Sequence, residues 1–163
     1  MPLRGRFHLE YKGQKWIQDN FILDGGEESF LKMITQGDVT DIALGGNWYV
    51  GLCGSNTLTE SSVLADISDE VGTSNGYARQ ALTRDLTGWP TVARVDPYFR
   101  ALSATATFTA SGGDFDATFT RPFLTNASAG TTGILYAVAN PLLTPVLVLD
   151  TESFNLNYEL YLA

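Results

Sequence analysis

The stretch SFNLNYELYL, residues 153–162, decides the fold of this chain. Its apolar side chains alternate with polar ones, which is the period of a strand that has one face in a core. We therefore predict that one face packs against the core or a partner, and that this face carries Phe154, Leu156, Tyr158, Leu160 and Leu162. The other face carries Ser153, Asn155, Asn157, Glu159 and Tyr161.

Segments before this one predict further strands. Residues 101–108 alternate in the same way. After a predicted hairpin turn at residues 111–114, the alternation continues through Phe115, Ala117 and Phe119. Residues 134–138 form a continuous apolar run, which suits a buried central strand, and residues 146–149 form another. The second half of the chain is therefore expected to be strand after strand.

Residues 1–26 are predicted to form an N-terminal arm and a hairpin. Residues 7–11 alternate as a half-buried strand does, and residues 12–15 carry turn-forming residues before the next apolar run. Residues 1–6 contain two arginines on an otherwise acidic chain. We expect this arm to extend from the body and to contact a neighbouring subunit.

One short helix is predicted over residues 27–36. Glu27 and Glu28 suit the positive end of a helix dipole. The helical spacing places three residues on one apolar face, namely Phe30, Met33 and Ile34. Gly37 is expected to end the helix, because glycine adopts the left-handed conformation that closes many helices.

The middle of the chain predicts two more strands. Residues 47–53 alternate between turns at Gly45-Gly46 and Gly54-Ser55-Asn56, and residues 77–83 follow a glycine-containing turn. Residues 59–71 fit either a short helix or a loop that turns three apolar side chains inward. Those side chains are Leu64, Ile67 and Val71.

Length and composition favour a single folded domain. The chain has 163 residues, of which 44% are hydrophobic, so it can bury a core. Together with the strand patterns, this predicts a mainly β fold. We expect one antiparallel β-sandwich or jelly-roll-like domain over residues 27–163, with one short helix and an N-terminal arm.

The charge of the chain disfavours two classes of partner. Its net charge is −8 and its pI is about 4.4, so it repels the phosphates of nucleic acid and anionic membrane surfaces. No apolar run follows the basic residues 1–6, so no signal peptide is expected. The most apolar stretch, residues 134–149, is interrupted by Asn140, Pro141 and Pro145, so we do not expect it to span a membrane.

Residues that commonly carry catalysis are sparse. Cys53 is the single cysteine and His8 the single histidine. Cys53 falls in a predicted strand, where it is expected to act as a small buried hydrophobe. A reactive thiol needs an oriented base beside it, and the sequence gives no sign that His8 supplies one. We therefore expect no catalytic pair.

The acidic clusters are expected to be structural. Asp66, Asp69 and Glu70 could hold a hard cation such as calcium, but they lack the spacing of a known calcium loop, so a solvated loop is favoured. Asp114 and Asp116 would share a strand face as a glycosidase pair requires, but a polar sheet face is favoured. We expect no enzyme activity, no metal site and no cofactor.

The order of three phrases resembles that of small virion proteins of tailed bacteriophages. The phrases are WYVGL at residues 48–52, LADISDE at residues 64–70 and GYARQALT at residues 76–83. The resemblance covers residues 47–83 and, more loosely, the strands of residues 101–162. In such proteins the third phrase is a structural strand entry, and Arg79 is expected to pair with a nearby acidic group. It lacks the glycine and lysine pattern of a phosphate-binding loop.

The resemblance implies a non-enzymatic structural protein of the virion, assembled in the host cytoplasm. Its first implication is a capsid decoration or cement protein that stabilises the shell, with the major capsid protein or other virion proteins as partners. Such proteins commonly act as symmetric homo-oligomers, often trimers. The alternative within the virion is a tail-tip, baseplate or fibre component.

The sequence also offers candidates for an interface. Arg4 and Arg6 supply positive charge at the N-terminus, and Trp89, Tyr98 and Phe99 lie near turn signals in a stretch without regular pattern. Aromatic side chains on loops either anchor interfaces or fix the loop to the core, and the sequence leaves both open. An alternative of another class is a carbohydrate-binding module, which would need several aromatic rings in one plane.

Overall fold

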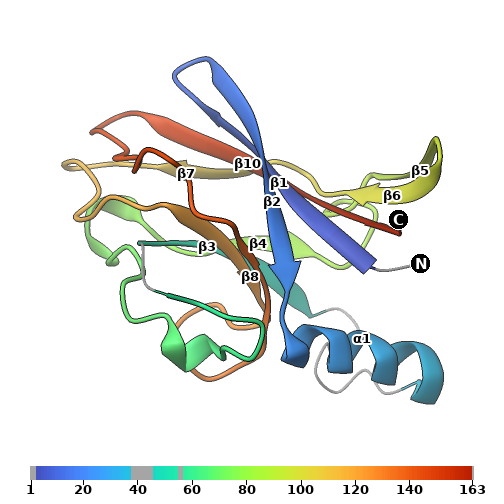
Figure 1. The fold of residues 1–163 in the computed structure, drawn as a ribbon. Helices are drawn as coiled ribbons and strands as arrows, with labels where there is room; N and C mark the ends of the chain where they lie inside the picture. Colours follow the sequence, from blue (N-terminus) through green and yellow to red (C-terminus); the bar gives the residue numbers. More distant parts are fainter. Residues whose placement is uncertain (1–2, 38–45, 55–56, 163) are drawn as a thin grey trace.

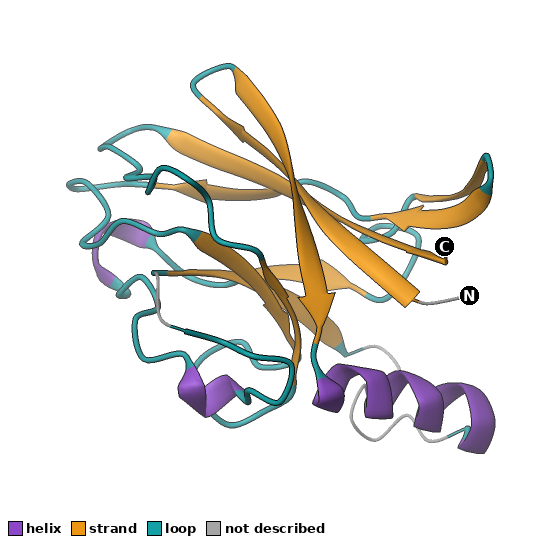
Figure 2. Cartoon of the chain, in the orientation of Figure 1, coloured by secondary structure: helices purple, strands orange, loops and turns teal. Residues whose placement is uncertain are grey.

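The computed structural model describes residues 3–37, 46–54 and 57–162, and these are mainly β (Figures 1 and 2). The strands are β1 (Leu3–Tyr11), β2 (Gln14–Ile22), β3 (Asn47–Cys53), β4 (Gln80–Thr83), β5 (Thr91–Val95), β6 (Tyr98–Leu102), β7 (Ala106–Thr109), β8 (Arg121–Thr125), β9 (Leu135–Ala139) and β10 (Ser153–Leu162). In the described residues there is one α-helix, α1 (Asp24–Gln36), with two 3₁₀ turns at Leu64–Asp66 and Ser74–Gly76. No helix in this part of the chain has the length and apolar character that crossing a membrane requires.

The strands form an antiparallel sheet that curls on itself. Their order is β4-β3-β8-β9-β2-β1-β10-β6-β5, and β7 also pairs with β10. Strand β2 connects the two layers, because its first residues pair with β1 while residues 20–22 pair with β9. Figure 1 shows β1, β10 and β6 in one layer and β3, β4 and β8 in the other. The predicted mainly β, sandwich-like fold is confirmed.

Aromatic side chains fill the space between the layers. Tyr158 of β10 pairs with Phe7 of β1 in the same layer, with ring centroids 4.8 Å apart, and Phe154 of β10 contacts Phe119, also at 4.8 Å. All four rings are fully buried. Burying one such side chain contributes about 1.5–3 kcal/mol, so these rings account for much of the stability of the core.

A second apolar cluster lies outside the layer of β3, β8 and β9. It contains Leu23, Cys53, Leu58, Leu64, Ile67, Phe123, Leu135 and Val138. The loop of residues 57–71 covers it, and Leu64, Ile67 and Val71 are all buried. The structure thus combines the two predicted alternatives for this segment, because one 3₁₀ turn sits inside an inward-packed loop.

Strand β10 follows its predicted alternation for most of its length. Phe154, Leu156 and Tyr158 are buried in the core, but Leu160 is only half-buried and Leu162 is exposed. On the opposite face, Glu159 and Tyr161 are buried instead. Of the two predicted surroundings for the apolar face, core or partner, the core therefore covers residues 154–158 and not Leu162. Charged side chains from β1 and β6 cover the other face there.

The residues from Leu3 onward, which were predicted to start as an arm, belong to strand β1 of the sheet. All nine residues of β1 pair with β10, and residues 6–11 pair also with β2, so β1 is a central strand. The predicted hairpin is confirmed, with Lys12 and Gly13 in the left-handed region at its turn. The predicted extension of residues 1–6 is wrong for residues 3–6, while Met1 and Pro2 lie outside the described residues.

Helix α1 begins earlier than predicted and ends where expected. Gly37 has a φ of 64°, and its N–H donates to the carbonyl of Lys32, as predicted. Of the predicted apolar face, Phe30 is buried and Met33 is half-buried, but Ile34 is exposed. The helix packs on β9, and beyond Met33 its residues 34–36 are exposed. The predicted turns at Gly45 and at Ser55-Asn56 fall outside the described residues.

Several predicted strands are shorter or absent. Residues 101–108 contain two strands, β6 and β7, which both pair with β10. Residues 115–119 and 146–149 form no strand, and a single bridge joins Phe119 to Val146. The apolar residues there fix loops to the core, and Ala117 is exposed. Residues 111–114 therefore do not close a hairpin, and β4 begins at Gln80 instead of residue 77.

Candidate functional site

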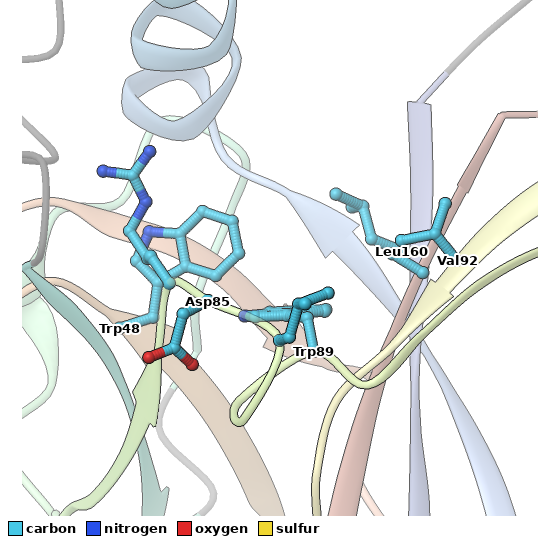
Figure 3. A pocket seen from close by; sticks show the side chains of 8 residues that line it. Trp48, Asp85, Trp89, Val92 and Leu160 are labelled. Atoms are coloured by element: carbon cyan, nitrogen blue, oxygen red, sulfur yellow. The ribbon is translucent and has the colours of Figure 1, made fainter.

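A pocket opens at the end of the sandwich where the two layers separate (Figure 3). Its volume is about 410 Å³. The lining comes from β3, β5, β6, β10 and the loop before β5, and consists of Trp48, Arg84, Asp85, Leu86, Trp89, Val92, Ala101 and Leu160. Most of this lining is apolar, yet the pocket is open to solvent.

Three neighbouring strands, β5, β6 and β10, form one wall of the pocket. Val92 pairs with Ala101, and Ala101 pairs with Leu160, so three apolar residues lie side by side on three neighbouring strands. Directly opposed residues share a face of a sheet, and here that face looks toward the interior of the sandwich. The hairpin of β5 and β6 projects beyond the body (Figure 1), so this inward face is left uncovered.

Two tryptophans form the floor. The rings of Trp48 and Trp89 are nearly perpendicular, at 86°, with centroids 5.1 Å apart. Trp48 also contacts Phe30 and Tyr136, and Trp89 contacts Tyr158, so both rings are fixed to the core. Their indole nitrogens are buried and have no hydrogen-bond partner. The guanidinium of Arg84 lies 5.9 Å from the centre of the Trp48 ring.

Asp85 holds the loop that carries Trp89. Its Oδ1 accepts the Thr83 hydroxyl at 2.7 Å and the N–H groups of Thr87 and Gly88 at 2.8 and 3.0 Å. The Thr83 hydroxyl, followed by the Gly88 N–H, holds the pKa of Asp85 below its ordinary value. Gly88 is required here, because an added Cβ would lie 2.0 Å from the Thr83 carbonyl oxygen.

The structure brings most of the predicted interface residues to this end of the molecule. Trp89 lines the pocket, while Tyr98 stacks on Tyr161 with centroids 5.1 Å apart. Phe99 is 58% exposed on the projecting hairpin. Among the described residues, half of the ten exposed large apolar side chains lie on the elements around the pocket, namely Leu86, Val92, Val95, Phe99 and Leu162.

The two predicted arginines differ. Arg4 is exposed and pairs in register with Tyr161. Arg6 donates to the Tyr161 hydroxyl at 2.8 Å and forms ion pairs with Asp19 and Glu159. That hydrogen bond is the main reason why the pKa of Arg6 is raised. Arg6 thus holds the sheet together at this end, and Arg4 remains available to a partner.

His8 and Cys53 occupy different layers. His8 Nε2 lies 2.8 Å from the buried carboxylate of Glu159, which also accepts from Arg100 at 3.2 Å. Cys53 is fully buried, its thiol donates to the Arg121 carbonyl at 3.3 Å, and burial raises the pKa of the thiol. Both side chains have structural partners, and the structure does not bring them together.

The acidic side chains singled out in the sequence bind backbone or cations of the chain. Asp66 accepts from the Val63 N–H, and Glu70 holds Arg79 as predicted. Asp114 and Asp116 accept from the N–H groups of Asp150 and Gly72, respectively, and no strand aligns them. Among the described residues, no group of three or more His, Cys, Asp and Glu side chains could hold a metal ion.

Sequence reasoning missed the pocket itself. It placed Trp48 in a strand and Leu160 on a face that meets the core or a partner, and it assigned no role to Arg84, Asp85 or Val92. A usable signal was the run TVARV at residues 91–95, which has strand-forming residues but too little alternation for a strand with one buried face. Compared with models of protein families and with curated proteins, the chain matches neither a family nor a sequence.

Proposed function

We propose that this chain is a non-enzymatic structural protein of a bacteriophage virion, and that it decorates and stabilises the capsid shell. In this proposal the pocket at the open end of the sandwich receives an apolar side chain of the major capsid protein. The observation that carries it is an apolar pocket surrounded by exposed apolar residues, with Leu86 84% and Val92 71% exposed. Such patches mark interaction sites on soluble proteins.

The chemistry of the pocket supports binding over bond breaking. Asp85 is its carboxylate, and the hydrogen bonds of that carboxylate go to its own loop. Arg84 lies against the face of Trp48, where a guanidinium is attracted to the ring. The remaining lining is aliphatic or aromatic. An inserted side chain would gain buried area against two rigid indoles, which are frequent anchors of protein interfaces.

The phrases that resemble virion proteins support a structural role. Trp48 belongs to the floor of the pocket, and residues 64–70 and 76–83 are tied to β3 by the Glu70–Arg79 ion pair and the Tyr77 hydroxyl. A capsid presents many equivalent sites, so weak contacts at each site add up when the bound protein is a symmetric oligomer. We therefore include a homo-oligomer in the proposal.

Two alternative functions would require a different position in the particle or a different arrangement of aromatic rings. A tail-tip, baseplate or fibre component could use the same pocket, and its position in the particle distinguishes it. A carbohydrate-binding module would favour coplanar rings for a flat sugar face, whereas Trp48 and Trp89 are perpendicular. The perpendicular pair fits an inserted side chain better than a sugar ring.

The test is attachment to particles that lack the protein. We expect Val92→Asp to lower the amount that co-sediments with particles by at least about tenfold, because a charge would enter the apolar contact. The fold should be unaffected, since Val92 is largely exposed. The matched control is Leu143→Asp, at a fully exposed leucine outside the pocket lining, which should attach as the original chain does. Equal attachment of both variants would contradict the pocket as the docking site.

A further inference from the structure

We propose that β5 is a dimerisation edge, on which a second copy of this chain pairs through its own β5 about a two-fold axis. The two sheets would then continue into each other. The inference deepens the proposed function and rests on it for the expectation of a symmetric oligomer. It specifies the surface, the partner and the register.

Strand β5 differs from the opposite end of the sheet. It is the last strand in the order and pairs with β6, and Thr91, Val92, Arg94 and Val95 are all exposed. Strand β4, at the other end, has Leu82 buried and lies close to β7 across the sandwich. The hairpin of β5 and β6 instead projects into solvent (Figure 1).

An exposed hairpin of this kind is poorly stabilised alone. Strand β6 pairs with β10 only through residues 100–102, so residues 94–99 consist of two strands alone, which are marginally stable in water. The open edge of β5 also presents unpaired backbone N–H and C=O groups, which readily take up another strand. Natural edge strands are commonly protected by charged residues or proline, but Thr91–Val95 contains one charged residue and two valines. Pairing with a further strand would satisfy the backbone and cover those valines.

The sequence of β5 suits antiparallel pairing with itself. A two-fold axis through Ala93 lets all five residues pair, with Thr91 opposite Val95 and Val92 opposite Arg94 of the second copy. The aliphatic part of Arg94 then covers a valine. A two-fold axis through Arg94 would place two arginines directly opposite each other, which is destabilising, and would pair fewer residues.

Charge also favours this edge as the meeting place of two copies. The chain carries a net charge of −8, so most approaches between two copies are repulsive. Residues 84–102 contain three arginines and two aspartates, a net charge of +1. Two copies therefore meet with less repulsion through the hairpin than through the acidic remainder of the surface.

A charge exchange at Ala93 tests the proposal in solution. We expect the full chain to sediment as a dimer. Ala93→Glu and Ala93→Lys should each be monomeric, because like charges would face each other on the axis, and an equal mixture of the two should again form dimers. Ala81→Glu, an exposed alanine on β4, is the matched control and should dimerise as the original chain does.

Cysteine cross-linking then tests the register. Under mild oxidation, Ala93→Cys should form a disulfide-linked dimer, because facing Cα atoms about 4.5–5.5 Å apart allow the bond. Thr91→Cys should not, because the two copies of residue 91 would be about 13 Å apart. Cys53 does not interfere, since it is buried.

The results of the dimerisation experiments can be told apart from those of the particle-attachment test. A monomeric or trimeric original chain would overturn the proposal, as would dimerisation of Ala93→Glu alone or equal cross-linking at residues 91 and 93. A chain that dimerises through Ala93 but does not attach to particles would uphold this inference and contradict the proposed function. Val92 belongs to both surfaces, so the attachment of Val92→Asp is compared with that of the original chain at the same oligomeric state, and the two proposals then fail separately.

Discussion

Arg79 and Glu70 form a two-pronged ion pair at the centre of the sequence that resembles virion proteins. Arg79 Nε donates to Glu70 Oε1 at 2.8 Å, and Nη2 donates to Oε2 at 2.6 Å. The guanidinium also donates to the carbonyls of Ala127 and Gly130, at 2.9 and 2.8 Å. The Tyr77 hydroxyl donates to the same carboxylate and accepts from the Leu52 N–H, both at 2.9 Å. Three segments separated in sequence thus form one structural unit.

Removing this guanidinium should destabilise the fold strongly. Arg79→Ala leaves the Glu70 carboxylate with the Tyr77 hydroxyl but without its cation, and it removes the donor of two loop carbonyls; Arg79 is nearly fully buried. We expect a loss of about 3 kcal/mol in the free energy of unfolding, measured by chemical denaturation. Arg94→Ala is the control, because its partner Asp96 is exposed, and it should cost under about 1 kcal/mol. Similar losses in the two variants would mean that the buried pair does not organise these segments.

Strand β10 should show unequal sensitivity on its two faces. Leu156 is fully buried, so Leu156→Ala should cost about 2–5 kcal/mol. Asn155→Ala removes one hydrogen bond, with Thr107, and should cost about 1 kcal/mol. Denaturant melts of the two variants measure the difference, and equal costs would show that this part of β10 is not half-buried as described.

The carboxyl of Asp85 should titrate below its ordinary pKa of 3.8. Because the folded-state pKa is lowered, the stability that Asp85 contributes is present above pH 3.8 and is lost as the pH falls through the folded-state value. Carboxyl NMR measures this pKa. Thr83→Ala removes its main cause, so the pKa should rise toward 3.8. An unchanged pKa in Thr83→Ala would show that the hydroxyl does not hold this loop.

Removing residues 1–6 should lower the melting temperature. If these residues formed the arm expected from the sequence, their removal would leave the melting temperature almost unchanged. The structure pairs residues 3–6 with β10, and Arg6 binds Tyr161, Asp19 and Glu159. We expect the free energy of unfolding to fall by about 2–4 kcal/mol, because the backbone hydrogen bonds to β10 and the Arg6–Tyr161 hydrogen bond are lost. If the truncated chain has the melting temperature of the original, residues 1–6 are an arm that does not contribute to the stability of the fold.

The sequence predicted elements whose signal is local. The alternation in residues 153–162 predicted β10, the continuous apolar run predicted β9, and Gly37 predicted the end of α1. It failed where distant partners decide the structure. Phe115 and Phe119 alternate like strand residues, yet no neighbouring strand pairs with that segment, so they anchor a loop. Arg6 has no local signal of burial either, because its partners Tyr161 and Glu159 lie on β10, at the other end of the chain.

The pocket could not be predicted for a related reason. Its wall combines Val92, Ala101 and Leu160, which come together only through the pairing of three strands. Its floor depends on the angle between Trp48 and Trp89, which lie in different segments. What the sequence did provide was Trp89, Tyr98 and Phe99 as candidates for an interface, and the structure places all three at the open end.

The most direct test of the account is a cryo-EM reconstruction of the virus particle that carries this chain. We predict many symmetry-related copies on the capsid shell, each with the open end of its sandwich against the major capsid protein and an apolar side chain of that protein between Trp89 and Val92. A particle without the chain, with a single copy, or with copies whose pocket faces solvent would contradict the account.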